Sequence, residues 1–368
     1  MITIKLSIPG FEDVDISQFI GRTDNTVRDC VFYVNRDDIK VADYWVCLEA
    51  PYKTVETCRV KKDNVFFLNA ETAWPRFFYD SELKKNFLMQ FGRIYTCHDI
   101  YATHAFFGLP YLPWMINANH GQAVFSSHAR DRLFFEQLTS LPKTKSLSVF
   151  CSNQTWTEDH KLRLKFVKAL KAHFGDKLDW FGNGIEPLEQ KWDGIAPYRY
   201  HIALENQSRN NVITEKLYDT FLGLAYPIYY GAPNASEYFD SNSFSTIDIV
   251  DIKGSIEIIE KILESDLYEQ RLSAVIASKN LVLSQYNLFE RIADICLAAQ
   301  ATIPRSDPSV EENVVLMTMN QFDVKQDLTA LFKKNRLSLI LKRLIYYYPG
   351  SLLKKWGARL LRQYDNQR

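Results

Sequence analysis

The sequence predicts an α/β protein of two domains built on mainly parallel sheets, and three observations lead there. The chain has 368 residues, which suits two domains of roughly 150 residues each. It is 46% hydrophobic and 24% charged, which is the composition of a globular protein and excludes a disordered or fibrous one. Short apolar runs alternate with helical patterns, and this spacing is typical of parallel sheets.

The elements follow in order from the apolar runs and their periodicity. The expected strands are 2–8, 44–48, 65–68, 94–97, 147–151, 200–205 and 227–230. Amphipathic helices are expected over 160–173 and 215–224. A polar stretch at 140–146, SLPKTKS, separates the two units, and the segment ATIPRSDPSVEEN carries two prolines. We therefore expect an N-terminal domain over 1–142, a C-terminal domain over 143–303, and a linker and tail over 304–368.

The neutral net charge conceals a basic tail. Lys+Arg and Asp+Glu both number 44, yet residues 331–368 hold ten basic residues and one acid, Asp365. This tail carries +9, so the remaining residues carry −9. Two basic amphipathic helices are expected on either side of Pro349-Gly350, and such helices with Trp and Tyr are typical of interfacial anchors on anionic lipid. The alternative is that they pack on the acidic body of the protein.

The remaining composition favours a cytoplasmic protein attached peripherally to the inner face of the membrane. Six widely spaced cysteines form no CxxC pair, which indicates free thiols in a reducing compartment. The N-terminus, MITIKLSIPGFEDVD, lacks the basic and apolar regions of a signal peptide. No run approaches the roughly 18 apolar residues of a membrane span. No nucleic-acid partner is expected.

The strongest chemical signal lies in the segment 198–239. A buried strand ends at Glu205-Asn206, a polar loop follows, and Thr214 can cap a helix that starts at Glu215. A helix start of this kind offers free N–H groups and suits a diphosphate. Lys216 opposes the helix dipole, which makes sense if it faces an anionic ligand, and Glu215 can accept from sugar hydroxyls. The alternative is an ordinary first-turn acid beside a solvated lysine.

These residues resemble a known family. The block ENQSRNNVITEKLYDTFLGLAYPIYYGAPN is similar to the α1,3/α1,4-fucosyltransferases of glycosyltransferase family ten, the bacterial members in particular. Two further segments match the family pattern. The segment 150–170 has a strand, then Ser152-Asn153, then a helix bearing Arg163, and the segment 65–78 has a strand, then Glu71 and Pro75. Taken alone, Arg163 would be a solvated helix charge and Glu71 a loop acid.

The resemblance implies a GT-B architecture, with two Rossmann-like domains facing each other across a cleft. The N-terminal domain would hold the glycan acceptor and the C-terminal domain GDP-fucose. Glu71 would be the catalytic base of an inverting α1,3-type transfer to an N-acetylglucosamine-containing surface polysaccharide or lipid-linked glycan. The donor-binding residues would be Ser152, Asn153, Arg163, Asn206, Thr214, Glu215 and Lys216. No cofactor and no essential metal are expected, because cations replace a metal in such folds.

The sequence also departs from the family pattern. Val212 stands where the family commonly has Tyr, and Ala70 stands where a Gly commonly precedes the base. The heptad-repeat stretch that the family has before the tail is absent. Two other hypotheses therefore remain: the same fold acting on a different GDP-sugar, or a non-catalytic protein that binds a glycan or nucleotide sugar.

Several further candidates favour ordinary structural roles. Cys97-His98-Asp99 with His104 fits no standard zinc spacing. His120 and His128 are expected in a loop, and His201 in the core or the cleft. The segment 182–184, GNG, predicts a turn after a strand. Aromatic residues of the first half can stack on acceptor sugars or belong to the core: Trp74, Tyr111 and Trp114.

Overall fold

The computed structural model describes residues 1–70, 82–98, 104–118, 130–155, 157–302 and 312–323. By their contacts, residues 1–317 form one unit. A second unit covers 318–368, of which the short helix α10 (Asn320–Asp323) is described. Glu71, Asp99, His120, His128 and the basic tail lie outside the described residues. No helix in the described ranges is long and apolar enough to cross a membrane.

The first sheet has seven strands, and all its neighbours are parallel except the short pair β2–β3. Its order is β2 (Thr26–Val27), β3 (Cys30–Val34), β1 (Ile2–Ser7), β4 (Tyr44–Leu48), β6 (Val65–Leu68), β7 (Arg93–Thr96) and β8 (Ala105–Phe107). The helices of this half are α1 (Ser17–Ile20) and α3 (Glu82–Leu88). Every residue of β4 and β6 is buried, and continuous apolar runs of this kind are typical of parallel strands covered on both faces.

The second sheet has five strands, all parallel, in the order β10 (Leu178–Phe181), β9 (Lys145–Phe150), β11 (Tyr198–Leu204), β12 (Tyr226–Tyr230) and β13 (Ser245–Thr246). Its helices are α5 (Glu158–Phe174), α6 (Glu215–Leu222), α7 (Ile252–Leu263) and α8 (Leu267–Leu283), and α4 (Arg132–Gln137) precedes the sheet in the chain. Two parallel α/β sheets confirm the predicted fold class.

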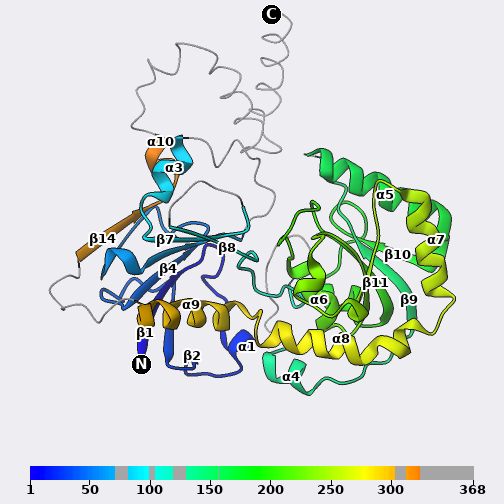
Figure 1. The fold of residues 1–368 in the computed structure, drawn as a ribbon, viewed down its shortest axis with the longest axis horizontal. Coiled ribbons are helices and arrows are strands. Elements are labelled where there is room, and N and C mark those ends of the chain that lie inside the picture. Colours follow the sequence, from blue (N-terminus) through cyan, green and yellow to red (C-terminus); the bar gives the residue numbers. More distant parts are fainter. Residues whose placement is uncertain (71–81, 99–103, 119–129, 156, 303–311, 324–368) are drawn as a thin grey trace, which may run out of the picture. The chain divides into compact units, whose positions relative to one another are not determined.

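The connections of the second sheet create a gap at its carboxyl edge. The chain leaves β9 through α5 toward β10, whereas it leaves β11 through α6 toward β12 on the other side. Right-handed crossovers in opposite directions place α5 and α6 on opposite faces, as Figure 1 shows. The strand order therefore reverses between β9 and β11, and ligands of open α/β sheets bind at such a switch point.

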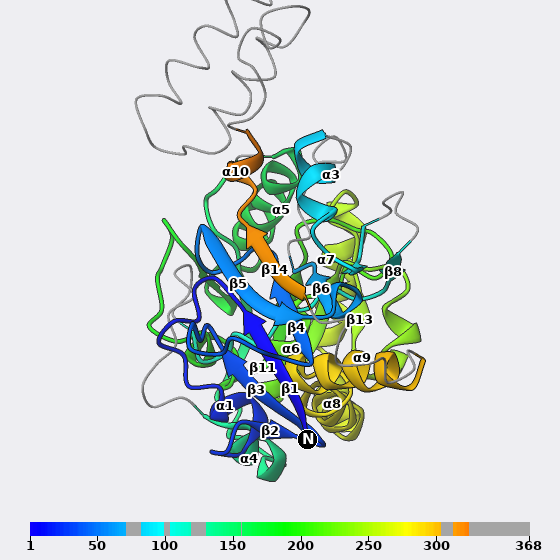
Figure 2. The ribbon, with the colours of Figure 1, turned by 90° about the vertical axis from the view of Figure 1, so that its left-hand side faces the viewer.

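The chain returns to the first half after α8. Helix α9 (Leu288–Thr302) contacts α1 and β2, and Arg28 Nε lies 3.2 Å from Glu290 Oε2. Strand β14 (Glu312–Met317) then pairs antiparallel with β5 (Val55–Val60), and the two lie side by side in Figure 2. The segment 304–368, predicted as linker and tail, thus contains a paired strand, while the boundaries at 142 and 303 stay a prediction.

The predicted aromatic and cysteine candidates belong to the core where they are described. Trp114 is buried and its ring lies 5.1 Å from that of Phe19, and Tyr111 is buried under the guanidinium of Arg291. These two residues are core aromatics, and the stacking alternative does not apply to them. All six cysteines are buried.

Candidate functional site

A cavity of about 550 Å³ opens at the switch point of the second sheet. It lies at the carboxyl ends of β9 and β11 and beside the start of α6, where Ser152, Leu204 and Asn206 line it. Of the seven predicted donor-binding residues, five line this cavity: Ser152, Arg163, Asn206, Glu215 and Lys216. Side chains that lie 64 positions apart in the sequence therefore meet around one space.

The other two predicted residues lie just outside the cavity. Thr214 is buried and caps α6, as expected from the sequence: its Oγ1 accepts from the N–H of Lys216 at 3.4 Å. Asn153 donates through its backbone N–H to the carbonyl of Asn183 at 3.1 Å. Asn183 itself lines the cavity, within the predicted turn 182–184. Both residues can shape the site without touching a ligand.

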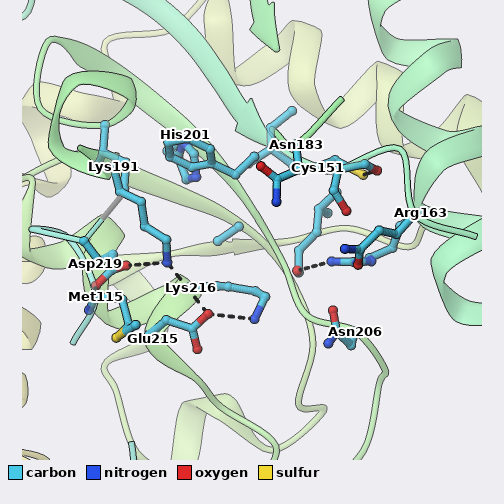
Figure 3. Close-up of a pocket in the computed structure, with 18 of the residues that line it drawn as sticks. Met115, Cys151, Arg163, Asn183, Lys191, His201, Asn206, Glu215, Lys216 and Asp219 are labelled. Atoms are coloured by element: carbon cyan, nitrogen blue, oxygen red, sulfur yellow. Dashed lines mark hydrogen bonds and ion pairs between the residues drawn. The ribbon is translucent and has the colours of Figure 1, made fainter. Parts of the chain in front are cut away.

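A compact group of charges lies on one side of the cavity (Figure 3). Lys216 Nζ donates to Glu215 Oε1 at 2.9 Å and lies 3.8 Å from Glu205 Oε2. Burial alone would raise the pKa of Glu215, but the ammonium groups of Lys216 and Lys191 outweigh it and hold that pKa at about 2. Burial alone would lower the pKa of Lys216, yet Glu215 and Glu205 raise it. Both groups stay charged at neutral pH.

Lys216 is therefore neither a solvated surface lysine nor an unpaired cation. Its side chain is 27% exposed and its carboxylate partners neutralise it. The alternative of a solvated Lys216, which the sequence left open, is wrong. Glu205, fully buried, holds the cap residue below this group, because its carboxylate accepts both the N–H and the hydroxyl of Thr214 at 2.7 Å.

Arg163 stands on the other side of the cavity (Figure 3). It is 7% exposed, and one guanidinium nitrogen donates to the carbonyl of Leu204 at 3.3 Å. Its Nε is buried without a hydrogen-bond partner, and no carboxylate pairs with it among the residues the structure describes. A buried cation with an unused donor costs free energy, and an anion in the cavity would offset that cost.

Sequence reasoning missed two charged residues of the site, Lys191 and Asp219. Lys191 starts a short 3-10 turn, Lys191–Gly194, and Asp219 lies one turn along α6 from Glu215. Lys191 Nζ donates to Asp219 Oδ2 at 3.1 Å. Only the spacing of Glu215 and Asp219, four apart on one helix face, could have signalled that they share the cavity.

The apolar and neutral part of the lining includes Phe150, Ile195 and His201. The Ser148 hydroxyl donates to the carbonyl of Gly194 at 2.7 Å and lies 2.8 Å from His201 Nδ1. Because that hydroxyl has a single hydrogen, His201 donates to it through Nδ1. His201 is thus a buried residue that also faces the cavity, which unites the two roles that the sequence allowed.

One departure from the expected pattern, Val212, has a clear place in the fold. Val212 is fully buried, and its carbonyl accepts from the hydroxyl of Tyr229 at 3.4 Å, so its side chain belongs to the core rather than to the cavity.

Within the described ranges, no group of three His, Cys, Asp or Glu residues is placed to hold a metal ion. Cys97 Sγ instead lies 3.2 Å from the side-chain oxygen of Asn69.

Comparison with known proteins supports the predicted resemblance. Residues 141–271 match the family described as glycosyltransferase family 10 (fucosyltransferase), C-terminal domain. This segment contains β9 to β13, α5, α6 and every charged residue of the cavity named above. A search of curated protein sequences found no match.

Several solved structures resemble the chain at low sequence identity. An α1,3-fucosyltransferase has 16% identity and a TM-score of 0.45, with 74% of this chain and 80% of that chain covered. A structure titled α1,3-fucosyltransferase with GDP has 13% identity and a TM-score of 0.45, with coverage of 77% and 90%. A glycosyltransferase from Rickettsia africae ESF-5 has 9% identity and a TM-score of 0.40, with coverage of 81% and 98%.

The fold class and the family model agree with the expected GT-B arrangement of two α/β units. Over residues 141–271, the chain resembles the C-terminal domain of the family-ten fucosyltransferases, as the sequence predicts.

Proposed function

We propose that the protein is an inverting fucosyltransferase that moves L-fucose from GDP-β-L-fucose to a glycan hydroxyl. The observation that carries the proposal is the cavity at the switch point, with Arg163 buried on one side and the α6 start on the other. Its residues fall inside the segment that matches the family-ten C-terminal domain. An unpaired buried guanidinium facing a helix N-terminus suits a nucleoside diphosphate.

The chemistry needs a single displacement, because a β-linked donor yields an α-linked product. The acceptor oxygen would attack the anomeric carbon while Glu71 takes its proton, and the bond between that carbon and the phosphate oxygen breaks. The electron pair of this bond leaves with GDP. Arg163, Lys216 and the N–H groups at the start of α6 would stabilise the negative charge that grows there.

We propose further that these cations replace a divalent metal, so that no cofactor is needed. The acceptor would be an N-acetylglucosamine-containing surface polysaccharide or a lipid-linked oligosaccharide, joined by an α1,3-type linkage. The basic tail, 331–368, would attach the enzyme to an anionic membrane surface on the cytoplasmic side. Its net charge of +9 supports that part of the proposal.

The test is a donor screen on the full-length protein that measures GDP release and glycoside formation. GDP-fucose is expected to be consumed when a suitable acceptor is present, and activity is expected to survive a chelator. Complete loss of activity with the chelator would contradict metal independence. Consumption of another GDP-sugar, with none of GDP-fucose, would contradict the donor assignment.

The main alternative function is transfer from a GDP-sugar other than GDP-fucose. Val212 motivates it, because a buried core side chain occupies the position where the family commonly has a tyrosine. If the protein binds GDP-sugars but releases no GDP with any acceptor, the non-catalytic alternative holds instead.

A further inference from the structure

Lys191 has its position in the cavity fixed at both ends. Its backbone N–H donates to the carbonyl of Ala118 at 3.2 Å, and the next N–H, of Trp192, donates to the carbonyl of Ile116 at 2.9 Å. At the far end, its ammonium donates to Asp219 Oδ2 at 3.1 Å. The side chain is 15% exposed, so most of it has left water. These contacts fix the position of the Lys191 ammonium in the cavity.

Asp219 is the residue that holds this ammonium. It is 1% exposed, and its two oxygens have separate partners: Oδ1 accepts from the N–H of Met115 at 2.8 Å, and Oδ2 accepts from Lys191. Burying a carboxylate is costly unless it is paired and hydrogen-bonded, and here both conditions are met. Both oxygens of Asp219 are thus hydrogen-bonded within the protein, and one of them holds the Lys191 ammonium in place.

The ammonium of Lys191 retains donor capacity toward the cavity. It has three N–H groups, and one acceptor within hydrogen-bond distance among the described residues, Asp219. Glu215 Oε1 lies farther away, at 3.8 Å. Asp219 also neutralises its charge, in contrast to Arg163, which has no carboxylate partner in the described part of the chain.

This charge pattern separates two kinds of ligand group. A cation without a carboxylate, Arg163, suits phosphate oxygens. An ammonium with unused N–H groups next to a carboxylate acceptor, Lys191 beside Glu215, suits hydroxyl groups, because a hydroxyl accepts one hydrogen bond and donates another. Figure 3 shows the two arrangements on different sides of the cavity.

We propose that Lys191 is a ligand-binding residue that donates to a hydroxyl of the bound nucleotide sugar, with Asp219 as its positioning residue. The inference rests on the proposed function for the identity of the ligand. Such a donor carries hydroxyl groups in two places, on the ribose and on the transferred sugar.

The test is calorimetric binding of GDP, 2′,3′-dideoxy-GDP and GDP-fucose to the full-length protein and to Lys191→Met. Loss of one charge-assisted hydrogen bond weakens binding about tenfold. If the ribose is the ligand group, the variant loses about tenfold for GDP and nothing for the dideoxy nucleotide. If the transferred sugar is the ligand group, the loss appears for GDP-fucose and not for GDP.

Two further variants test the positioning role and the specificity of the effect. Asp219→Asn keeps an oxygen for Met115 and loses the negative charge, so it is expected to show the same selective loss as Lys191→Met. The double variant is then expected to lose no more than either single one. Lys168→Met, an exposed lysine on α5, is the matched control and is expected to bind all three ligands normally.

Equal affinity of Lys191→Met and the wild type for all three ligands would overturn the inference, and so would the same loss for all three. Either result leaves the proposed function standing if the wild type binds GDP. A wild type that binds no GDP would contradict the proposed function and this inference together.

Discussion

The Glu205 carboxylate accepts two hydrogen bonds from one residue, the N–H and the hydroxyl of Thr214, each at 2.7 Å. Glu205 directly follows the strand β11 and Thr214 caps the helix α6, so this pair ties the strand to the helix across the intervening loop. Lys216 Nζ lies 3.2 Å from the same Thr214 hydroxyl oxygen. One buried carboxylate thereby fixes the helix start against which a diphosphate would lie.

Removing that carboxylate is expected to destabilise the protein. Glu205→Ala leaves the N–H and hydroxyl of Thr214 without their acceptor in a fully buried place, which costs about 3 kcal/mol of unfolding free energy. Urea unfolding followed by circular dichroism measures it. The control Glu237→Ala removes an exposed acid that bonds Asn234, and it is expected to change stability by less than about 0.5 kcal/mol. Equal effects of the two variants would contradict the prediction.

Arg163→Gln is expected to weaken GDP binding by about 10- to 100-fold, since a charge-assisted contact is lost. The fold is expected to persist, because the amide can still reach toward the carbonyl of Leu204. Calorimetric titration with GDP measures the affinity. Lys165→Gln, on the exposed face of the same helix, is the control. Unchanged affinity of Arg163→Gln would remove this residue from the site.

The pH dependence of stability is expected to carry a signature of Asp219. Burial raises the pKa of its carboxyl from 3.8 to about 6, against the opposing effect of Lys191. The folded state therefore binds this proton more tightly than the unfolded state, and the wild type loses stability through this group as pH rises from about 4 to about 6. Two pKa units correspond to about 3 kcal/mol.

Asp219→Asn has no such titration. Its unfolding free energy, relative to that of the wild type, is expected to increase by about 3 kcal/mol between pH 4 and pH 7. The groups that face Asp219, namely Lys191, Glu215 and the N–H of Met115, are unchanged in the comparison. The low pKa of Glu215, about 2, keeps its own titration below this range. A constant difference between the two proteins would show that Asp219 titrates normally.

Glu71→Gln tests the proposed base. Transfer is expected to fall at least about 100-fold, the contribution typical of general base catalysis, while GDP affinity stays normal. Rates come from GDP release with the acceptor identified in the donor screen. Asp63→Asn, in the same half of the chain, serves as the control acid. Full activity in Glu71→Gln would remove the assignment.

Removal of residues 328–368 tests the tail. The shortened protein is expected to lose binding to vesicles that contain anionic lipid and to keep its rate on a soluble acceptor. Sedimentation with vesicles measures binding, and vesicles of neutral lipid are the control. Retained binding to anionic vesicles would show that the tail is not the membrane contact.

The sequence predicts the parallel strands well and the long-range pairs poorly. Strands 44–48 and 65–68 were predicted with the observed limits, because their continuous apolar runs are buried on both faces. Strand β14 was missed because the proline-containing segment before it reads as a linker, and its short apolar run, 314–317, pairs with the distant strand β5. No local sequence pattern predicts that a strand pairs with another about 250 positions away.

The residues of the site also fall into those that local sequence predicts and those that only tertiary structure brings together. Thr214 as helix cap and Lys216 beside it follow from local rules, since a cap and a first helical turn are adjacent in sequence. Lys191 looks like any lysine in a polar loop, and Asp219 like any acid on a helix. Their meeting at 3.1 Å depends on how the turn at 191–194 docks against α6, which is a property of tertiary structure.

The hydrogen bond from the Met115 N–H to Asp219 limits where the chain can be cut to express a C-terminal fragment. Leu112, Met115 and Ala118 line the cavity at the switch point, yet they precede the expected boundary at 142. A C-terminal half expressed from residue 143 would leave Asp219 without its amide donor and would lose one wall of the pocket. The half that matches the family-ten C-terminal domain therefore depends on residues before its boundary, and fragments meant for ligand studies should begin upstream of Leu112.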